Sequence, residues 1–103
     1  MVTVVAVFTV KPEHADEAIE ILKGIVEQSH GEEGCLRYTL HQAKNKPDTW
    51  SIVEKWRSQE DLDAHFKMPY MQRMADAAGM LLEPPTILFC DPVPVGDGEK
   101  GSL

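Results

Sequence analysis

Two titratable side chains occupy positions where the sequence pattern expects a buried apolar residue, and both are suited to acid–base chemistry. His65 lies in the segment LDAHFKMPYM, where helical spacing places it on one apolar face with Leu62 and Phe66. Glu54 lies in the segment TWSIVEKWR, where alternation places it on the same strand face as Trp56. Burial without a charged partner keeps an imidazole neutral, and a neutral imidazole can accept a proton.

Each of these two residues has two interpretations. His65 is either a half-buried core histidine hydrogen-bonded to a neighbour, or a catalytic base that lines a cavity between helices and sheet. A ring packed without an adjoining cavity would contradict the catalytic interpretation. Glu54 either pairs with Arg37 or Lys55, which we favour, or lies near the cavity and orients His65 or a substrate hydroxyl.

The aromatic residues near these two positions are either core residues or the walls of a ligand pocket. An aromatic-lined pocket with few polar groups suits a flat aromatic ligand. With His65 as the catalytic residue, the residues predicted to line the substrate pocket are Tyr38, Glu54, Trp56, Phe66 and Tyr70.

The other histidines and the cysteines do not suggest a metal site. His14, His30 and His41 have no metal-ligand spacing, and we interpret them as structural or solvated. Cys35 and Cys90 lie far apart and form no CxxC motif. The chain also contains no phosphate-binding loop and no hydrolase elbow. We therefore expect neither a metal nor a cofactor.

Four strands and two helical regions are predicted to position these residues. The strands are expected at 2–10, 35–42, 49–57 and 86–90, and the first helix at 13–29. Ser58 and Asp61 resemble a capping box that opens the helix carrying His65, and Pro69 begins a further helix that ends near Gly79. The order β-α-β-β-α-β predicts an α+β, ferredoxin-like fold with the second and fourth strands on opposite edges of an antiparallel sheet.

Apolar periodicity predicts which helix faces are buried. The first helix is expected to bury Ala15, Ala18, Ile19, Leu22 and Val26. The last helix is expected to bury Met71, Met74, Ala75 and Ala78.

The first and fourth strands are apolar on both faces, although helices of the same chain can cover only one face of this sheet. Val5 and Val7 oppose the inward residues of the first strand, and Leu88 opposes those of the fourth. We therefore expect a homodimer formed through the uncovered sheet face.

Composition narrows the classes of partner. The 103 residues carry a formal charge of −7, and the basic residues are scattered, so nucleic acid and anionic membrane surfaces are disfavoured. No apolar run could span a membrane and no signal peptide is visible, so a cytoplasmic protein is expected. We expect one domain over residues 1–92 and a Pro- and Gly-rich tail over 93–103.

The segments EEGCLRYTLHQ, VEKW and SQEDLDAHFKMPYM, in this order and spacing, resemble the antibiotic biosynthesis monooxygenase (ABM) family and especially its small bacterial quinol monooxygenase-like members. The resemblance covers about residues 2–92 and includes the motif E-x-W followed by A-H-x-x-x-P-[YH]. It implies a dimeric ferredoxin-like α/β barrel whose pocket lies between sheet and helices. It also implies oxidation of a quinol or polyphenol by O₂ without metal or flavin, with the substrate supplying the electrons.

Related activities leave alternatives open. Haem degradation is not expected, because Val5, His65 and Ala75 do not match the residues that the haem-degrading branch uses. An isomerase acting on a small phosphorylated, autoinducer-type metabolite remains an alternative, with Arg37, Lys67 and Arg73 as the candidate phosphate ligands. A dimeric ligand-binding module without catalysis is the third alternative.

Overall fold

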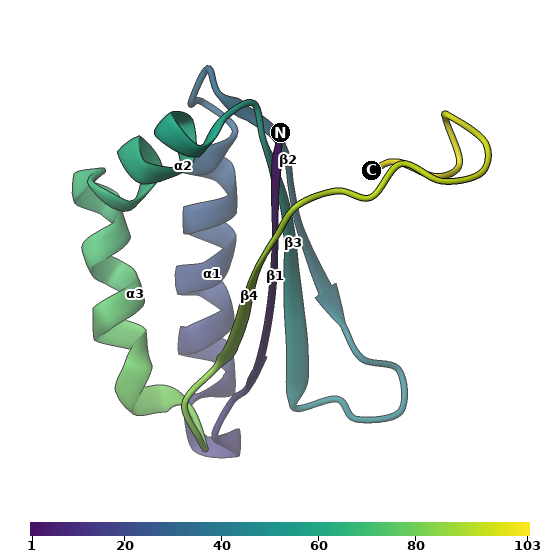
Figure 1. Cartoon of the computed structure of the whole chain (residues 1–103). Coiled ribbons are helices and arrows are strands. Elements are labelled where there is room, and N and C mark those ends of the chain that lie inside the picture. Colours follow the sequence, from purple (N-terminus) through teal and green to yellow (C-terminus); the bar gives the residue numbers. More distant parts are fainter.

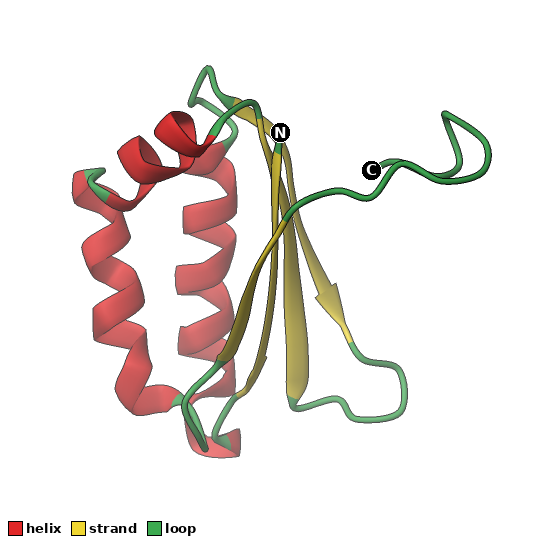
Figure 2. Ribbon diagram, viewed as in Figure 1, coloured by secondary structure: helices red, strands yellow, loops and turns green.

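The computed structural model describes residues 1–103 as a four-stranded sheet with three α-helices and short 3₁₀ turns. The strands are β1 (Val2–Thr9), β2 (Cys35–Gln42), β3 (Thr49–Trp56) and β4 (Thr86–Cys90). The helices are α1 (Ala15–Ser29), α2 (Gln59–Phe66) and α3 (Gln72–Ala77), with 3₁₀ turns η1 (Pro12–His14), η2 (Pro69–Met71) and η3 (Ala78–Met80). All helices lie on one face of the sheet (Figures 1 and 2). The predicted α+β, ferredoxin-like fold is confirmed.

The sheet has the strand order β2-β3-β1-β4, and every neighbouring pair is antiparallel. The second and fourth strands are therefore the two edges, as predicted. Cys35 lies on one edge strand and Cys90 on the other, and both are free thiols. None of the helices has the length and apolar character needed to cross a membrane.

The core lies between the helices and the inward face of the sheet. Alternation along β1 buries Val2, Val4, Ala6 and Phe8, and alternation along β3 buries Ile52, Glu54 and Trp56. The predicted shared face of Glu54 and Trp56 is thus confirmed.

Helix α1 packs on the sheet through a face slightly different from the predicted one. Its buried residues are Ala18, Ile21, Leu22, Ile25 and Ser29, whereas Ile19 and Val26 are only partly buried. Both sets repeat at helical spacing, because the apolar stripe of α1 is wider than one face. Packing against the sheet, rather than periodicity, determines that the buried face of α1 is the one that includes Ser29.

The predicted stripe of α3 is partly wrong. Met71 and Met74 pack against the core and Ala77 is buried, but Ala75 and Ala78 are exposed. Helix α3 has only six residues and a 3₁₀ turn on each side. Residues three apart share a face in such turns, so the buried line runs through positions 71, 74 and 77.

The outward face of the sheet keeps apolar side chains at its surface. Val5 pairs with Leu88 across β1 and β4, and these two side chains share this face. Val7 is 40% exposed and Leu88 is 54% exposed. On the inward side of β4, Ile87 and Phe89 are exposed as well. The expectation that both strands are apolar on both faces is confirmed.

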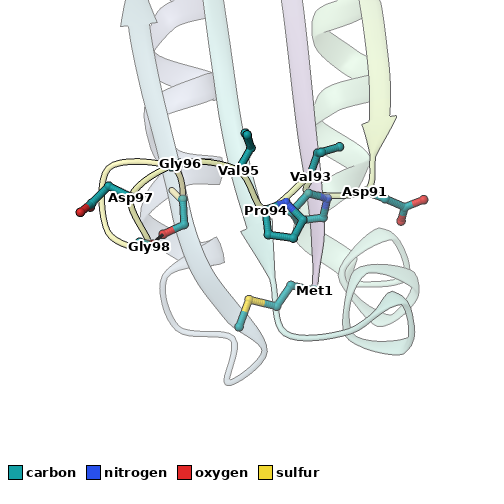
Figure 3. A pocket seen from close by; sticks show the side chains of 11 residues that line it. Met1, Asp91, Val93, Pro94, Val95, Gly96, Asp97 and Gly98 are labelled. Atoms are coloured by element: carbon teal, nitrogen blue, oxygen red, sulfur yellow. Dashed lines mark hydrogen bonds between the residues drawn. The ribbon is translucent and has the colours of Figure 1, made fainter.

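Residues 91–103 follow β4 as a tail without helix or strand, on the side of the sheet opposite the helices (Figure 1). The tail bends back so that Lys55 Nζ donates a hydrogen bond to the Leu103 carbonyl oxygen at 2.7 Å. With Met1 it encloses an open hollow of about 620 Å³, which Val93 and Val95 help to line (Figure 3).

Candidate active site

Helix α2 carries His65, and its first turn is held by the cap that the sequence predicts. Ser58 Oγ accepts a hydrogen bond from the Asp61 backbone N–H at 3.1 Å. The Arg57 guanidinium donates to both carboxylate oxygens of Asp61, at 2.9 and 3.0 Å. This contact, with the Ser58 hydroxyl, lowers the pKa of Asp61. The start of α2 is thereby fixed to the end of β3.

The ring of His65 is completely buried against the inward face of the sheet. It packs on Trp56 with a ring-centroid distance of 4.5 Å, and on Tyr38 at 5.6 Å. Tyr70, from η2, approaches from the helix side with its ring centroid at 6.1 Å. Elements far apart in the chain therefore build an aromatic enclosure around one imidazole.

One expectation about this region holds only in part and another is wrong. Phe66 packs beside His65 with its ring centroid at 5.4 Å, as expected, but the residue is 48% exposed and its ring also lies 6.1 Å from that of Phe89. Position 66 is the last residue of the eight-residue helix α2, and its ring neighbours both His65 and Phe89 of β4. His65 also lines none of the four main pockets of the chain, so it does not face an open cavity in this structure.

The two ring nitrogens of His65 have different surroundings. Nδ1 lies 2.7 Å from Glu32 Oε2, and the side chain of Glu32 is only 12% exposed. The Tyr70 hydroxyl donates a very short hydrogen bond to the same carboxylate oxygen and lies 3.2 Å from Nδ1. Nε2 is buried and has no hydrogen-bond partner. A buried polar atom without a partner is uncommon, and such atoms are often found where a ligand or a proton is handled.

Glu54 does not make the cross-strand ion pair that we favoured from the sequence. Its Oε1 accepts a hydrogen bond from Trp56 Nε1–H at 2.9 Å, while Lys55 lies on the other face of the sheet and contacts the tail. Burial raises the pKa of Glu54 to about 7, with the nearby Glu32 adding to the rise and the Trp56 hydrogen bond opposing it. Glu54 therefore holds the indole that stacks on His65, and Glu32 is the carboxylate that contacts the imidazole.

The two phenols of the site stay protonated at neutral pH. Burial raises the pKa of Tyr38, and the neighbouring Glu54 raises it further. Burial also raises the pKa of Tyr70, and its hydrogen bond to Glu32 acts in the same direction. Both side chains are consequently hydrogen-bond donors. Tyr70 donates to Glu32, which leaves Tyr38 as the phenol able to stabilise an oxyanion placed beside it.

Sequence reasoning missed Glu32 and Ser29. Ser29 ends α1, where its Oγ donates to the Ile25 carbonyl oxygen at 2.7 Å and lies 3.1 Å from the Tyr70 hydroxyl. Glu32 lies in the loop HGEEG, and the only signal for it was a pair of glutamates between two glycines. The neighbouring Glu33 is 89% exposed and lies 3.7 Å from Arg57. Nothing local to the loop distinguishes the inward glutamate from the outward one.

The remaining titratable groups lie outside this cluster. His30 Nε2 contacts the Tyr38 carbonyl oxygen at 2.8 Å, and His41 Nε2 contacts Thr39 Oγ1 at 2.9 Å. Burial, with Glu32 and then Glu54, raises the pKa of the Cys35 thiol to about 11. No group of three or more His, Cys, Asp or Glu side chains is arranged to hold a metal ion.

Comparison with known proteins gives a consistent family assignment. The family model for antibiotic biosynthesis monooxygenase (ABM) matches residues 1–77. "Uncharacterized protein sll1783" of Synechocystis sp. (strain ATCC 27184 / PCC 6803 / Kazusa) is 30% identical over 76 residues, which cover 74% of this chain and 52% of that protein. The chain thus matches about half the length of this relative.

Two further relatives match over most of their length. "Putative monooxygenase YcnE" of Bacillus subtilis (strain 168) is 27% identical over 85 residues, covering 82% of this chain and 90% of that protein. The crystal structure of an antibiotic biosynthesis monooxygenase has a TM-score of 0.86 at 25% identity, covering 91% of this chain and 100% of that chain. The chain belongs to the antibiotic biosynthesis monooxygenase family.

Proposed function

We propose that the protein is a cofactor-independent monooxygenase that oxidises a quinol or polyphenol-like substrate with O₂, and that His65 is its catalytic base. The observation that carries the proposal is the unpartnered Nε2 of His65, buried among the aromatic rings of Tyr38, Trp56 and Tyr70. A nitrogen base that has no other hydrogen-bond partner and lies among apolar rings can accept the hydroxyl proton of a flat aromatic substrate.

The proposed reaction needs no electrons beyond those of the substrate. Nε2 accepts the proton of a substrate hydroxyl, and the resulting phenolate passes one electron to O₂. The substrate radical and superoxide combine at a ring carbon, and the peroxide takes up the proton held by His65. Loss of the hydrogen on that carbon together with the outer oxygen, as water, leaves a carbonyl. One atom of O₂ enters the product and the other leaves as water.

The first proton transfer is the step that the protein has to assist. With ordinary pKa values of about 10 for a phenol and about 6.5 for an imidazole, the transfer is uphill by about 3.5 pKa units, or about 5 kcal/mol. Donors beside the phenolate reduce this cost. Tyr38 can act as such a donor, because burial keeps its phenol protonated, whereas the Tyr70 proton is already donated to Glu32.

The charges around His65 support a neutral substrate over a phosphorylated one. Glu32 and Glu54 are the acidic groups in contact with this cluster, and each would repel a phosphate when ionised. Arg37, a candidate phosphate ligand for the isomerase alternative, donates to its neighbouring Leu36 carbonyl oxygen at 2.8 Å and lines a separate hollow beside β2. The guanidinium of Arg73 lies against Gly24 of α1.

Complete burial of His65 favours a second candidate, a dimeric module without catalysis. The ring of His65 adjoins no cavity in this structure, which is the result expected to contradict a catalytic His65. The catalytic proposal therefore requires the enclosure to open, and we propose that the joint between α2 and η2 is the segment that moves. Phe66 and Met68 are exposed there and Tyr70 is partly exposed, so this segment is the thinnest wall of the enclosure.

We also propose that two chains pair through the outward sheet face, whose Val7 and Leu88 are exposed. A domain over residues 1–92, a separate tail over 93–103 and a cytoplasmic location complete the proposal. The two free thiols, Cys35 and Cys90, fit a reducing compartment.

Oxygen uptake by metal-free protein with a panel of reduced quinols tests the proposed activity. We expect uptake above the autoxidation blank, and a loss of about 100-fold or more in His65→Ala. His14→Ala is the matched control, because His14 lies in η1, outside the cluster. Uptake no faster than the blank across the panel, or unchanged uptake by His65→Ala, would contradict the proposal and favour the non-catalytic module.

A further inference from the structure

Glu32, in the loop between α1 and β2, is the carboxylate that contacts the ring of His65. We infer that Glu32 is a positioning residue, which holds His65 in the tautomer that has its proton on Nδ1 and a free lone pair on Nε2. The catalytic use of that lone pair rests on the proposed function, whereas the tautomer itself does not.

The distance between Nδ1 and Glu32 Oε2 requires a proton between them. Two lone pairs cannot face each other at 2.7 Å, so one of the two atoms carries a hydrogen. An imidazole is a stronger base than a carboxylate, so the hydrogen resides on Nδ1 and the carboxylate accepts it. In the neutral ring, Nε2 then has no hydrogen and keeps its lone pair.

Tyr70 strengthens this assignment, because its single hydroxyl proton is already used. That proton is donated to Glu32 Oε2, so Tyr70 cannot also donate to Nδ1, although the two atoms are 3.2 Å apart. The Ser29 hydroxyl donates to the Ile25 carbonyl oxygen and supplies no proton to the ring. Nδ1 must therefore provide the hydrogen of its own contact with Glu32.

The opposite tautomer would place a hydrogen on Nε2, where nothing can accept it. Nε2 is fully buried and has no partner, so an N–H there would be a buried donor left without an acceptor. The faces of the ring are covered by Trp56 and Tyr38. A bare Nε2 has no partner either, so the contact of Nδ1 with Glu32 decides the tautomer.

The loop that carries Glu32 is held firmly against α2. Gly34 is buried, and a Cβ at this position would collide with the Asp61 carboxyl group. The same Asp61 is bound by Arg57, whose backbone N–H also donates to the Gly34 carbonyl oxygen at 2.9 Å. The loop and the helix are thus joined at one point, which sets the separation of Glu32 and His65.

Nitrogen NMR on the ¹⁵N-labelled protein tests the inference directly. Spectra recorded under alkaline conditions, where imidazoles are neutral, distinguish a protonated ring nitrogen from a bare one for each of the four histidines. The His65 signals are assigned by their absence from His65→Asn. We expect wild-type His65 to be protonated on Nδ1, and protonation on Nε2 would overturn the inference.

Two variants then test whether Glu32 is the cause. Glu32→Met keeps the length of the side chain and removes its acceptor, and we expect the His65 proton to move to Nε2 and kcat to fall about 100-fold. Glu33→Gln is the matched control, because it removes the adjacent, exposed charge of the same loop. We expect its His65 tautomer and kcat to equal those of the wild type.

The outcomes separate this inference from the proposed function. An unchanged tautomer in Glu32→Met, or an equal change in Glu33→Gln, would overturn the positioning role whatever the rates are. If Glu32→Met does not fold, the wild-type spectrum still decides the tautomer, and Glu32→Leu, which also has no acceptor, replaces it for the rates. A protein that shows the expected tautomers but consumes no O₂ would refute the quinol oxidation and leave the role of Glu32 supported.

Discussion

Replacing the buried Glu54 with glutamine should stabilise the protein above neutral pH and leave its stability nearly unchanged in acid. Glu54 is only 6% exposed, and burial raises its pKa from 4.5 to about 7. Because the folded-state pKa lies above the unfolded one, the folded chain holds this proton more tightly. The resulting stability is present in full below about pH 4.5 and is lost as the pH rises through 7. Glutamine keeps the size and an acceptor for the Trp56 N–H without the charge.

The size of the effect follows from the shift. A rise from 4.5 to about 7 is about 2.5 pKa units, which corresponds to about 3 kcal/mol. The free energy of unfolding of the wild type should therefore fall by about 3 kcal/mol relative to Glu54→Gln between pH 4.5 and pH 8. The slope should be steepest between the two pKa values, where only the folded chain holds the proton.

Urea unfolding at a series of pH values measures this difference. The chain concentration must be the same throughout, because the stability of any dimer depends on it. Glu33→Gln is the control, because it removes an exposed carboxylate. Its free energy of unfolding should change with pH in the same way as that of the wild type. The free energy of unfolding is then plotted against pH for each protein. If the plots of Glu54→Gln and wild type run parallel from pH 4.5 to 8, Glu54 is not a buried acid with a raised pKa, and the reasoning fails.

Two further substitutions test the loop and the outward face. Gly34→Ala should lower the free energy of unfolding by about 1–3 kcal/mol, because the added methyl group collides with Asp61. Gly79→Ala, with open space around it, should leave the free energy of unfolding nearly unchanged. Equal effects of the two substitutions in thermal or urea unfolding would contradict the close approach of Gly34 and Asp61. Leu88→Asp, on the outward sheet face, should convert the proposed dimer to monomers, as measured by light scattering. Leu82→Asp, at a similarly exposed position off the sheet, should leave the dimer intact. A monomeric wild type would refute the dimer.

Local patterns in the sequence were enough to predict most of the elements. The strand TILFC was predicted with the bounds that the structure has. The Ser58–Asp61 cap was predicted at the start of the helix that carries His65, where the structure has it. Alternation also placed Glu54 and Trp56 on one buried face. These features depend on residues within a few positions of each other, where side-chain direction follows directly from the backbone period.

The composition of the site was decided by the tertiary structure. The aromatic residues that the sequence singled out around His65 are Tyr38, Trp56, Phe66 and Tyr70. The fold brings all of these rings to His65, but it leaves Phe66 half exposed and seals the His65 ring from solvent. Glu32 meets His65 across 33 positions of the chain, through a loop whose two glutamates look alike in the sequence. The same loop is held against α2 by the close packing of Gly34 on Asp61. Periodicity identifies a buried face, but only the packing of separate elements decides which atoms meet there, and the chemistry of His65 depends on those atoms.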